Sequence, residues 1–437
     1  MKGKIIKAAV LVGLLCFAGS MSEAAEYIPV QRRTVAAAVR QAKPVQSGKK
    51  TVARNAKKTA PKTANKKKPA VMAKKTVSSP DIEVGLVSGS GQVLLKGLTP
   101  FDVESDGKRW KSFPKGTDIT ASYGSKGITI NGKAFKNGAL LRPSGKEAAF
   151  MVKGNRYRGQ MKLIPSAWAN GLTVVNVVSL DDYLKGVVPC EVVPTWHMDA
   201  LKAQAVAART YAVYHKNSYR KGGYDVTDDT RSQVYRGVDA ETAATTRAVM
   251  ETAGEIITYG GKPIDAVFHS SGGGYTENSE NVWGTAVPYL KGVPETMKAE
   301  AWTKTVSLDA FSKALYGASP SAGAIKGIKL SRLKKGPVKA ADRGISGRVK
   351  SVELMGAKGK ATVSGEKIQG LFGLPSTLFD IRQSKKQVII TGYGSGHGLG
   401  LSQWGAEAMA ARSGGKKDYY RDILRHYYTG TKIEKIY

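Results

Sequence analysis

The sequence predicts an α+β protein, in which a mixed, β-rich N-terminal part and a helical region form a single composite globular unit after a disordered tether. Residues 82–178 alternate short apolar runs with Gly, Pro and Asn turns, which is typical of strands. Stretches rich in Ala, Leu, Gln, Lys and Arg follow, which is typical of helices. Because these helices do not alternate regularly with strands, the pattern favours α+β over repeated βαβ units.

The composition limits the classes of protein to be considered. The chain has 437 residues and a formal net charge of +34, with 68 Lys and Arg against 34 Asp and Glu. Two cysteines, Cys16 and Cys190, are too few for a disulfide scaffold and are not spaced as metal ligands. The five histidines are widely separated in the sequence, so we expect no bound metal and no cofactor.

Residues 1–25 have the pattern of a signal peptide. Lys2, Lys4 and Lys7 precede an apolar run over residues 8–18, and small residues near Ala25 form a cleavage site. We therefore expect export to the cell envelope, in a periplasm or on a cell wall, with loose anchoring or secretion. A short cytoplasmic helix is the alternative interpretation of the same residues.

Residues 26–80 are predicted to form a disordered basic tether. The stretch 27–80 holds 15 Lys and Arg and no acidic residue, and it cannot bury enough apolar surface to offset its conformational entropy. Since no nucleic-acid-binding motif is present, we expect no nucleic acid partner. Anionic envelope polymers are the partners that fit, and a solvated spacer is the alternative.

The remaining elements are expected in two regions, residues 81–165 and 166–437. In the first, apolar runs predict strands, and Asn131-Gly132 predicts a hairpin between Ile130 and Phe135. In the second, Thr195 is the expected N-cap of the first helix. Helices are predicted at residues 196–215, 240–252, 309–315, 403–412 and 419–428.

Glu191 is the first candidate catalytic residue in the sequence. It lies among valines and between Pro189 and Pro194. Burial among apolar neighbours raises the pKa of a carboxyl group, as a general acid working near neutral pH requires. A loop glutamate paired with a nearby base is the alternative.

Lys202 and Arg209 lie on a predicted helix rich in alanine. Their separation of seven residues places them on one face, about two turns apart. Two cations on one face can hold an acidic or carbonyl-bearing ligand, whereas solvated surface charge is the ordinary interpretation.

Two glycine-rich stretches are the other candidates. Residues 268–278 place Ser270 and Ser271 beside three glycines, and Trp283 and Tyr289 follow as residues that can stack on sugar rings. Residues 392–400 have glycine at every second position around His397, which suggests tight packing or a ligand groove. A serine hydrolase is disfavoured because no G-x-S-x-G motif is present.

At these stretches the chain resembles the stage II sporulation protein D and amidase enhancer family. Four motifs occur in the family's order, at residues 181–191, 201–211, 269–284 and 394–406. Members act on peptidoglycan, as lytic transglycosylases that cut strands stripped of stem peptides or as enhancers of a wall amidase. The resemblance implies peptidoglycan glycan strands as substrate, cleaved between N-acetylmuramic acid and N-acetylglucosamine to leave 1,6-anhydromuramoyl ends. A wall amidase is the implied protein partner.

The resemblance also implies roles for individual residues. The family's catalytic glutamate corresponds to Glu191, and its basic and tyrosine–lysine positions correspond to Lys202, Arg209, Tyr289 and Lys291. The residues implied to position the sugar are Gln233, Tyr235, Ser270, Ser271, His397 and Gln403. A non-enzymatic enhancer that binds the wall remains the alternative function, and an exported anion-binding scaffold is a third.

The sequence departs from the family at one place. Some members have C-D-x-T-H-C-Q-V-Y, in which Cys and His can bind a structural zinc, but Thr227, Arg231 and Ser232 occupy those positions here. None of the three is a good zinc ligand, so we predict no metal. An ion pair between Arg231 and an aspartate is the expected substitute.

Overall fold

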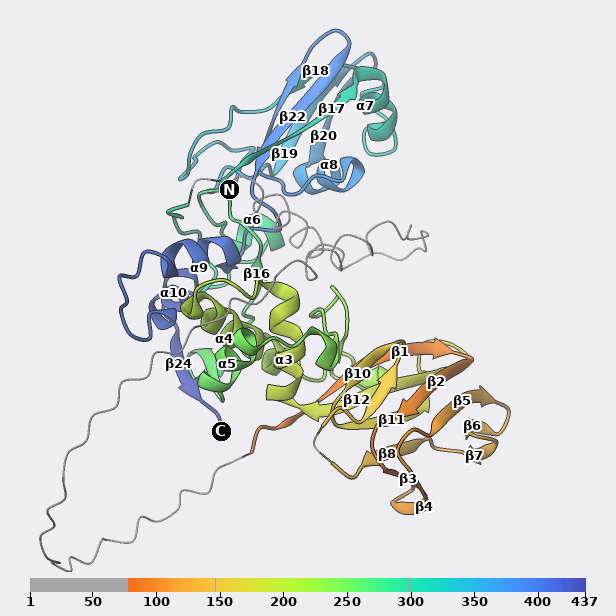
Figure 1. Ribbon diagram of the computed structural model, residues 1–437. Coiled ribbons are helices and arrows are strands. Elements are labelled where there is room, and N and C mark those ends of the chain that lie inside the picture. Colours follow the sequence, from red (N-terminus) through yellow and green to blue (C-terminus); the bar gives the residue numbers. More distant parts are fainter. Residues whose placement is uncertain (1–77, 146, 298) are drawn as a thin grey trace, which may run out of the picture. The chain divides into compact units, whose positions relative to one another are not determined.

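The computed structural model describes residues 78–145, 147–297 and 299–437 (Figure 1). The predicted signal peptide and nearly all of the predicted tether lie outside these residues. Ser79 and Pro80, placed at the end of the tether by the sequence, already contact the fold, because the Ser79 hydroxyl and the Pro80 carbonyl accept bonds from Asp181 and Leu180. Helices and strands are mixed, and the α+β class is confirmed.

The N-terminal half is built from two antiparallel sheets, apart from one short parallel pairing, of β1 with β13. The first has the order β13-β1-β12-β11-β8-β3-β4 and contains β1 (Asp81–Ser90), β3 (Phe101–Ser105), β4 (Lys108–Phe113), β8 (Ala139–Pro143), β11 (Gln160–Pro165), β12 (Leu172–Ser179) and β13 (Val226–Thr227). The second has the order β10-β9-β2-β5-β6-β7 and contains β2 (Gln92–Gly97), β5 (Asp118–Gly124), β6 (Gly127–Ile130), β7 (Lys133–Phe135), β9 (Phe150–Val152) and β10 (Asn155–Tyr157).

The predicted hairpin is confirmed. Asn131 and Gly132 have φ angles of 46° and 85° and connect β6 to β7, as a two-residue turn of this type requires. The division expected at residue 165 falls between β11 and β12, which are neighbours in one sheet. The residues on both sides of that division therefore share a sheet.

The helical region follows β12. Its helices are α3 (Leu180–Glu191), α4 (Met198–Tyr214), α5 (Ala243–Glu251), α6 (Ser279–Trp283), α9 (Gln403–Ala410) and α10 (Tyr420–Tyr427), with 3-10 turns η2 (Arg220–Gly222) and η3 (Gly237–Ala240). Small sheets pair β14 (Glu255–Tyr259) with β15 (Lys262–Pro263) and β24 (Lys432–Lys435), and β16 (Phe268–His269) with β23 (Leu401–Ser402).

Helix ends differ from the sequence expectations where capping groups differ. The prediction of Thr195 as N-cap of the first helix is wrong, because α4 begins at Met198 and the His197 ring nitrogen accepts the Asp199 amide at 3.2 Å. Helix α5 begins three residues later than expected, after its N-cap Thr242. Helix α3 was not expected, since Gly186 and Pro189 lie within it.

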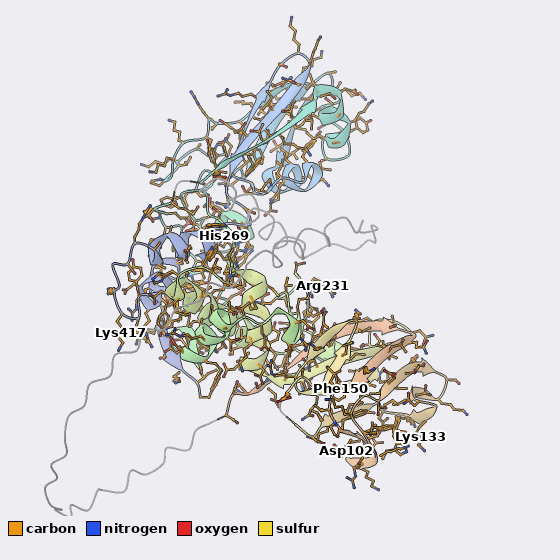
Figure 2. The ribbon with its side chains drawn as sticks, viewed as in Figure 1. Asp102, Lys133, Phe150, Arg231, His269 and Lys417 are labelled. Atoms are coloured by element: carbon orange, nitrogen blue, oxygen red, sulfur yellow. The ribbon has the colours of Figure 1, made fainter. Side chains whose placement is uncertain are left out.

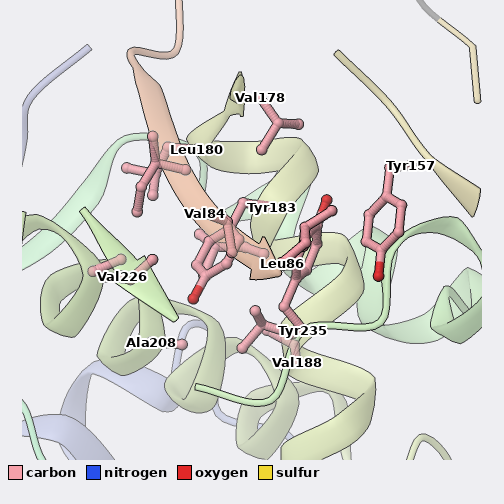
Figure 3. Close-up of a cluster of buried hydrophobic side chains, with 14 of the residues drawn as sticks. Val84, Leu86, Tyr157, Val178, Leu180, Tyr183, Val188, Ala208, Val226 and Tyr235 are labelled. Carbon is pink, nitrogen blue, oxygen red and sulfur yellow. The ribbon is translucent and has the colours of Figure 1, made fainter. Parts of the chain in front are cut away.

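One apolar core joins the N-terminal strands to the helices. Figure 3 shows Val84 of β1 gathered with Tyr183 and Val188 of α3 and with Tyr235. These four side chains are at most 1% exposed. The core fixes α3 against the first sheet and so determines where Glu191, the last residue of α3, lies.

Residues 301–393 form what we call the inserted module, which has a core of its own around Phe311, Val352 and Ile390. It contains β17 (Ala301–Ser307), α7 (Leu308–Leu315), β18 (Ile325–Lys329), β19 (Ser351–Gly356), β20 (Gly359–Ser364), α8 (Gly365–Phe372), β21 (Phe379–Gln383) and β22 (Gln387–Tyr393). The helix expected at 309–315 is confirmed, and α8 is additional. Two three-stranded sheets, β17-β22-β21 and β18-β19-β20, complete it.

None of the helices in the described residues combines the length and the apolar character that a membrane crossing needs.

Candidate active site

Glu191 ends helix α3. The Ser179 hydroxyl caps the helix by accepting the Asp182 amide at 3.2 Å, and Asp181 and Asp182 lie in the first turn, where acidic residues are favourable. Pro189 has no amide hydrogen and lies in the last turn. A glutamate at this end of a helix faces the negative end of the helix dipole, which disfavours its ionised form.

The Glu191 carboxyl group is buried, with 7% of the residue exposed. Burial raises its pKa from 4.5 to about 7, although the Val234 amide, 3.3 Å from Oε1, and the side chain of Gln403 lower it. A carboxyl group with this pKa is about half protonated at neutral pH. It can therefore donate a proton and later accept one, as a single acid–base catalyst requires.

Gln233 is held next to this carboxyl group. Its Oε1 accepts the Tyr183 hydroxyl at 3.2 Å, and its Nε2 donates to the Ala208 carbonyl at 3.4 Å. The following residue, Val234, supplies the amide that binds Glu191. Gln233 thus fixes the segment that contacts the carboxyl group, while its own amide is used within the protein.

The glycine-rich stretches bring Ser270 and Ser271 to the start of α9. The Trp404 amide donates to the Ser270 carbonyl at 3.0 Å, and the Ser271 and Ser395 backbones exchange two hydrogen bonds. Gln403, the first residue of α9, faces Glu191. Gln403 and Val234, the residue after Gln233, contact Glu191, and Ser270 joins the start of α9 through its backbone carbonyl. That Gln233, Ser270, Ser271 and Gln403 position a sugar stays a prediction.

Gln403 contacts the Glu191 carboxyl group, and this contact lowers the Glu191 pKa. Its Nε2 is buried and has no other hydrogen-bond partner among the described residues. An amide nitrogen carries two hydrogens, so one of them remains for a ligand carbonyl.

The two histidines of the glycine stretches brace the backbone. His397 Nδ1 accepts the Leu399 amide at 2.9 Å, so Nε2 carries the hydrogen and donates to the Phe268 carbonyl at 3.1 Å. Burial lowers the His397 pKa to about 4, and burial also holds the pKa of His269 well below its usual range. His269 (Figure 2) lies close by, with 5.4 Å between the ring centroids. Both rings are therefore neutral at pH 7.

Arg348 of the inserted module connects both glycine stretches. Its guanidinium is buried and donates to the Gly272 carbonyl at 3.1 Å and to the Gly396 carbonyl at 3.4 Å. Gly398 has a φ of 84°, and a Cβ there would overlap the guanidinium. Only glycine therefore fits at residue 398.

A cavity of about 210 Å³ adjoins this contact. Its lining combines the inserted module with α6 and includes Glu280, Asn281, Arg348, Lys350 and His397. Glu191 is not among its lining residues, so the cavity and the carboxyl group are separate features of the described chain.

The predicted role of Arg209 in ligand binding requires correction. Its side chain is 0% exposed and donates to Asp181 at 3.1 Å, to the Val249 carbonyl at 2.9 Å, and to Thr252 and Glu255. Asp181 lies at the start of α3, and Glu255 begins β14. Val249 and Thr252 lie at the end of α5, where backbone carbonyls favour a cation. Arg209 is a structural residue that joins three helices.

Lys202 also contacts groups within the protein. Its Nζ lies 2.6 Å from Glu251 and over the ring of Tyr420. Lys202 and Arg209 do share a face of α4, as the spacing predicts, but that face packs against the end of α5.

Tyr235 likewise packs in the core, where its hydroxyl donates to Asn176 at 3.0 Å. Tyr289 accepts the Asp265 amide at 3.1 Å, and Lys291 lies 3.5 Å from Glu280. Within the described part of the chain, none of these hydrogen bonds and ion pairs involves Glu191.

Two features of the helical region were not predicted from the sequence. Trp196 and Trp404 contact each other edge to face, with 4.8 Å between ring centroids, beside the start of α9. Gln204 of α4 is 1% exposed, and neither atom of its amide has a partner among the described residues. The sequence hints at these features only through a tryptophan next to Gln403 and a glutamine in an alanine-rich helix.

The loop that differs from the family is held by an ion pair. Arg231 (Figure 2) lies 2.9 Å from Asp229, and the Thr227 hydroxyl donates to the same carboxylate at 3.1 Å. The Ser232 hydroxyl accepts the Thr227 amide. The expected pairing of Arg231 with an aspartate is confirmed, and the hydroxyls of Thr227 and Ser232 add hydrogen bonds within the same loop.

Comparison with known proteins identifies two regions. A family model for stage II sporulation protein matches residues 169–259, and a domain of unknown function (DUF8618) matches residues 291–400. The second match includes the whole inserted module.

Individual relatives cover most of the folded chain. An uncharacterized protein of Brachyspira hyodysenteriae is 38% identical, covering 65% of this chain and 74% of that protein. The stage II sporulation protein D of Bacillus amyloliquefaciens is 35% identical, covering 69% and 89%. The amidase enhancer of Bacillus subtilis is 30% identical over 69% of this chain, which spans about half of that protein's length (48%).

Proposed function

Because this chain belongs to the stage II sporulation protein D family, we propose that it is a lytic transglycosylase of the cell envelope that cleaves peptidoglycan strands whose peptides have been removed. Its similarity to sporulation proteins D and to an amidase enhancer supports a role connected with the cell wall. The observation that carries the proposal is Glu191, whose buried carboxyl group has a pKa of about 7.

The proposed reaction needs one carboxyl group. Protonated Glu191 donates its proton to the oxygen that bridges N-acetylmuramic acid and N-acetylglucosamine, and the bond from this oxygen to C1 breaks. The resulting carboxylate then takes the proton of the muramoyl C6 hydroxyl, whose oxygen bonds to C1. The product is a 1,6-anhydro ring, and Glu191 is protonated again.

The surroundings of Glu191 suit a sugar. The second hydrogen of the Gln403 amide nitrogen can donate to an acetamido carbonyl, and the Ser270 backbone contacts the start of α9 beside Gln403. Trp196 and Trp404 offer partly exposed aromatic surface against which a sugar ring can pack. A hydrolase would need a second carboxylate to activate water.

The test is product analysis. Purified protein is incubated with amidase-treated peptidoglycan, and the fragments are identified by mass spectrometry. We expect anhydromuramoyl ends from the native protein, at least 100-fold fewer from Glu191→Gln, and no change for the control Glu434→Gln, an exposed glutamate of β24. Reducing ends instead would overturn the transglycosylase assignment, and full activity of Glu191→Gln would overturn the role of Glu191.

A non-enzymatic enhancer is the second candidate, favoured by the similarity to an amidase enhancer over 69% of this chain. This function needs the glycan-binding surface but no proton donor at residue 191. It predicts that native protein and Glu191→Gln accelerate a wall amidase equally and release no glycan fragments.

A further inference from the structure

The positive charge of the folded chain is concentrated in the inserted module. Residues 301–393 hold 17 Lys and Arg against 5 Asp and Glu, a formal charge of +12. Residues 1–80 carry +16 of the total of +34, which leaves +6 for the other 264 residues. The module is therefore the part of the described chain with the strongest attraction for anions.

Half of the module's net charge lies in one short stretch. Residues 326–339 hold six Lys or Arg and no Asp or Glu. We call these six residues the cationic strip; they are Lys326, Lys329, Arg332, Lys334, Lys335 and Lys339. All six are exposed, and none forms an ion pair with any carboxylate in the described residues.

Two acidic residues beside the strip, Asp342 and Asp380, form hydrogen bonds and an ion pair that hold its backbone. Asp380 accepts the Leu333 amide at 3.3 Å and pairs with the buried Arg343 at 2.9 Å, and Asp342 accepts the Ser331 amide at 2.6 Å. Arg343 in turn donates to the Ser331 carbonyl at 2.6 Å. These bonds fix the backbone of the strip beside β21 and leave its lysines and Arg332 without compensating charge.

The strip adjoins the glycine stretch of the candidate active site. Gly336 packs so closely on the ring of Tyr275 that a Cβ would lie 2.8 Å from it. The Val338 amide donates to the Ile345 carbonyl at 2.8 Å, and the Ile345 amide donates to Glu277 at 3.0 Å. Tyr275 and Glu277 belong to the same glycine-rich stretch as Ser270 and Ser271, so these contacts tie the strip to that stretch.

We propose that the cationic strip binds the carboxylates of a peptide-free glycan strand and so gives the inserted module its function. This inference rests on the proposed function. Removal of each peptide leaves a lactyl carboxylate on every second sugar, and an exposed row of cations suits regularly spaced charges. Arg209 and Lys202, the cations expected to bind that carboxylate, are occupied by Asp181 and Glu251.

Binding is measured without turnover. Each variant is made in the full chain with Glu191→Gln, and its affinity for soluble peptide-free glycan is determined at about 50 mM and 500 mM salt. The strip variant combines Arg332→Gln, Lys334→Gln, Lys335→Gln and Lys339→Gln. The matched control removes four exposed lysines of the N-terminal sheets and loops, by Lys108→Gln, Lys115→Gln, Lys126→Gln and Lys133→Gln.

We expect the strip variant to lose about tenfold in affinity at low salt, since an exposed ion pair contributes a factor of roughly 1.4 to 5. The loss should shrink at high salt because exposed charges are screened. The control should lose less than twofold. Glycan whose carboxylates have been converted to amides should bind native protein and strip variant equally.

Three outcomes would overturn the proposal: equal losses in the strip variant and control, no loss in the strip variant, or a loss seen only with a polyglycerol phosphate polymer. These outcomes are independent of catalysis. If the product analysis finds no cleavage while the strip result holds, the transglycosylase proposal fails and the strip remains a glycan-binding surface.

Discussion

Glu191 combines two positions that each disfavour a negative charge, burial and the C-terminal end of a helix. Its neighbours in the sequence, Val188, Val192 and Val193, made burial predictable. The contacts that tune the carboxyl group, from Val234 and Gln403, come from residues 43 and 212 positions away and could not be predicted.

The raised pKa predicts a pH-dependent stability. Below about pH 4.5 Glu191 is protonated in both the folded and unfolded states. Between about pH 4.5 and pH 7 the folded state binds more proton at Glu191 than the unfolded state does. The free energy of unfolding of the native protein therefore falls by about 3 kcal/mol as the pH rises from 4 to above 7. Glu191→Gln should therefore be about 3 kcal/mol more stable than native protein at pH 8 and nearly equal at pH 4.

Urea denaturation at the two pH values measures this difference. A stability difference that is the same at pH 4 and pH 8 would mean that the Glu191 carboxyl group titrates alike in both states.

At the scale of the element, α4 shows how tertiary contacts decide the role of a charge. The spacing of Lys202 and Arg209 correctly predicts a shared face. The sequence does not reveal that this face meets the end of α5, where Glu251 and three backbone or hydroxyl acceptors bind the two cations.

The two cations should therefore differ in their contribution to stability. Arg209→Met leaves Asp181 and the Val249 carbonyl without their buried partner, and we expect a loss of about 3–5 kcal/mol. Lys202→Met removes a pair nearer the surface and should cost much less than Arg209→Met. Equal losses in urea denaturation would contradict the structural role of Arg209.

The glycine stretch offers a second test at this scale. Gly398 and Gly414 both have positive φ angles, but only a Cβ at Gly398 would meet Arg348. Gly414→Ala should cost about 1 kcal/mol for backbone strain, and Gly398→Ala should cost about 1–3 kcal/mol more. Similar costs for both substitutions would show that Arg348 does not pack against this stretch.

At the scale of the whole molecule, the sequence indicated the α+β class and the Asn131-Gly132 hairpin because both depend on local patterns. For the inserted module the sequence indicated a helix, strand-like pieces and basic loops, but it did not separate the module from the rest of the chain. The module's independent core becomes evident only when α7, β19 and β22 are placed together.

We propose that Glu191 on α3, the loops braced by Arg348 and the cationic strip on the inserted module act on one strand of glycan. On this proposal, the positive charge of the strip favours strands that have already lost their peptides.

The pH dependence of cleavage tests the central claim most directly. If protonated Glu191 is the general acid, kcat/KM for peptide-free glycan should fall about tenfold for each pH unit above its pKa of about 7. Circular dichroism at each pH, together with binding to Glu191→Gln protein, separates this loss from unfolding or weaker binding. A rate that stays constant from pH 6 to pH 9, in protein that remains folded, would contradict the assignment of Glu191 as the acid.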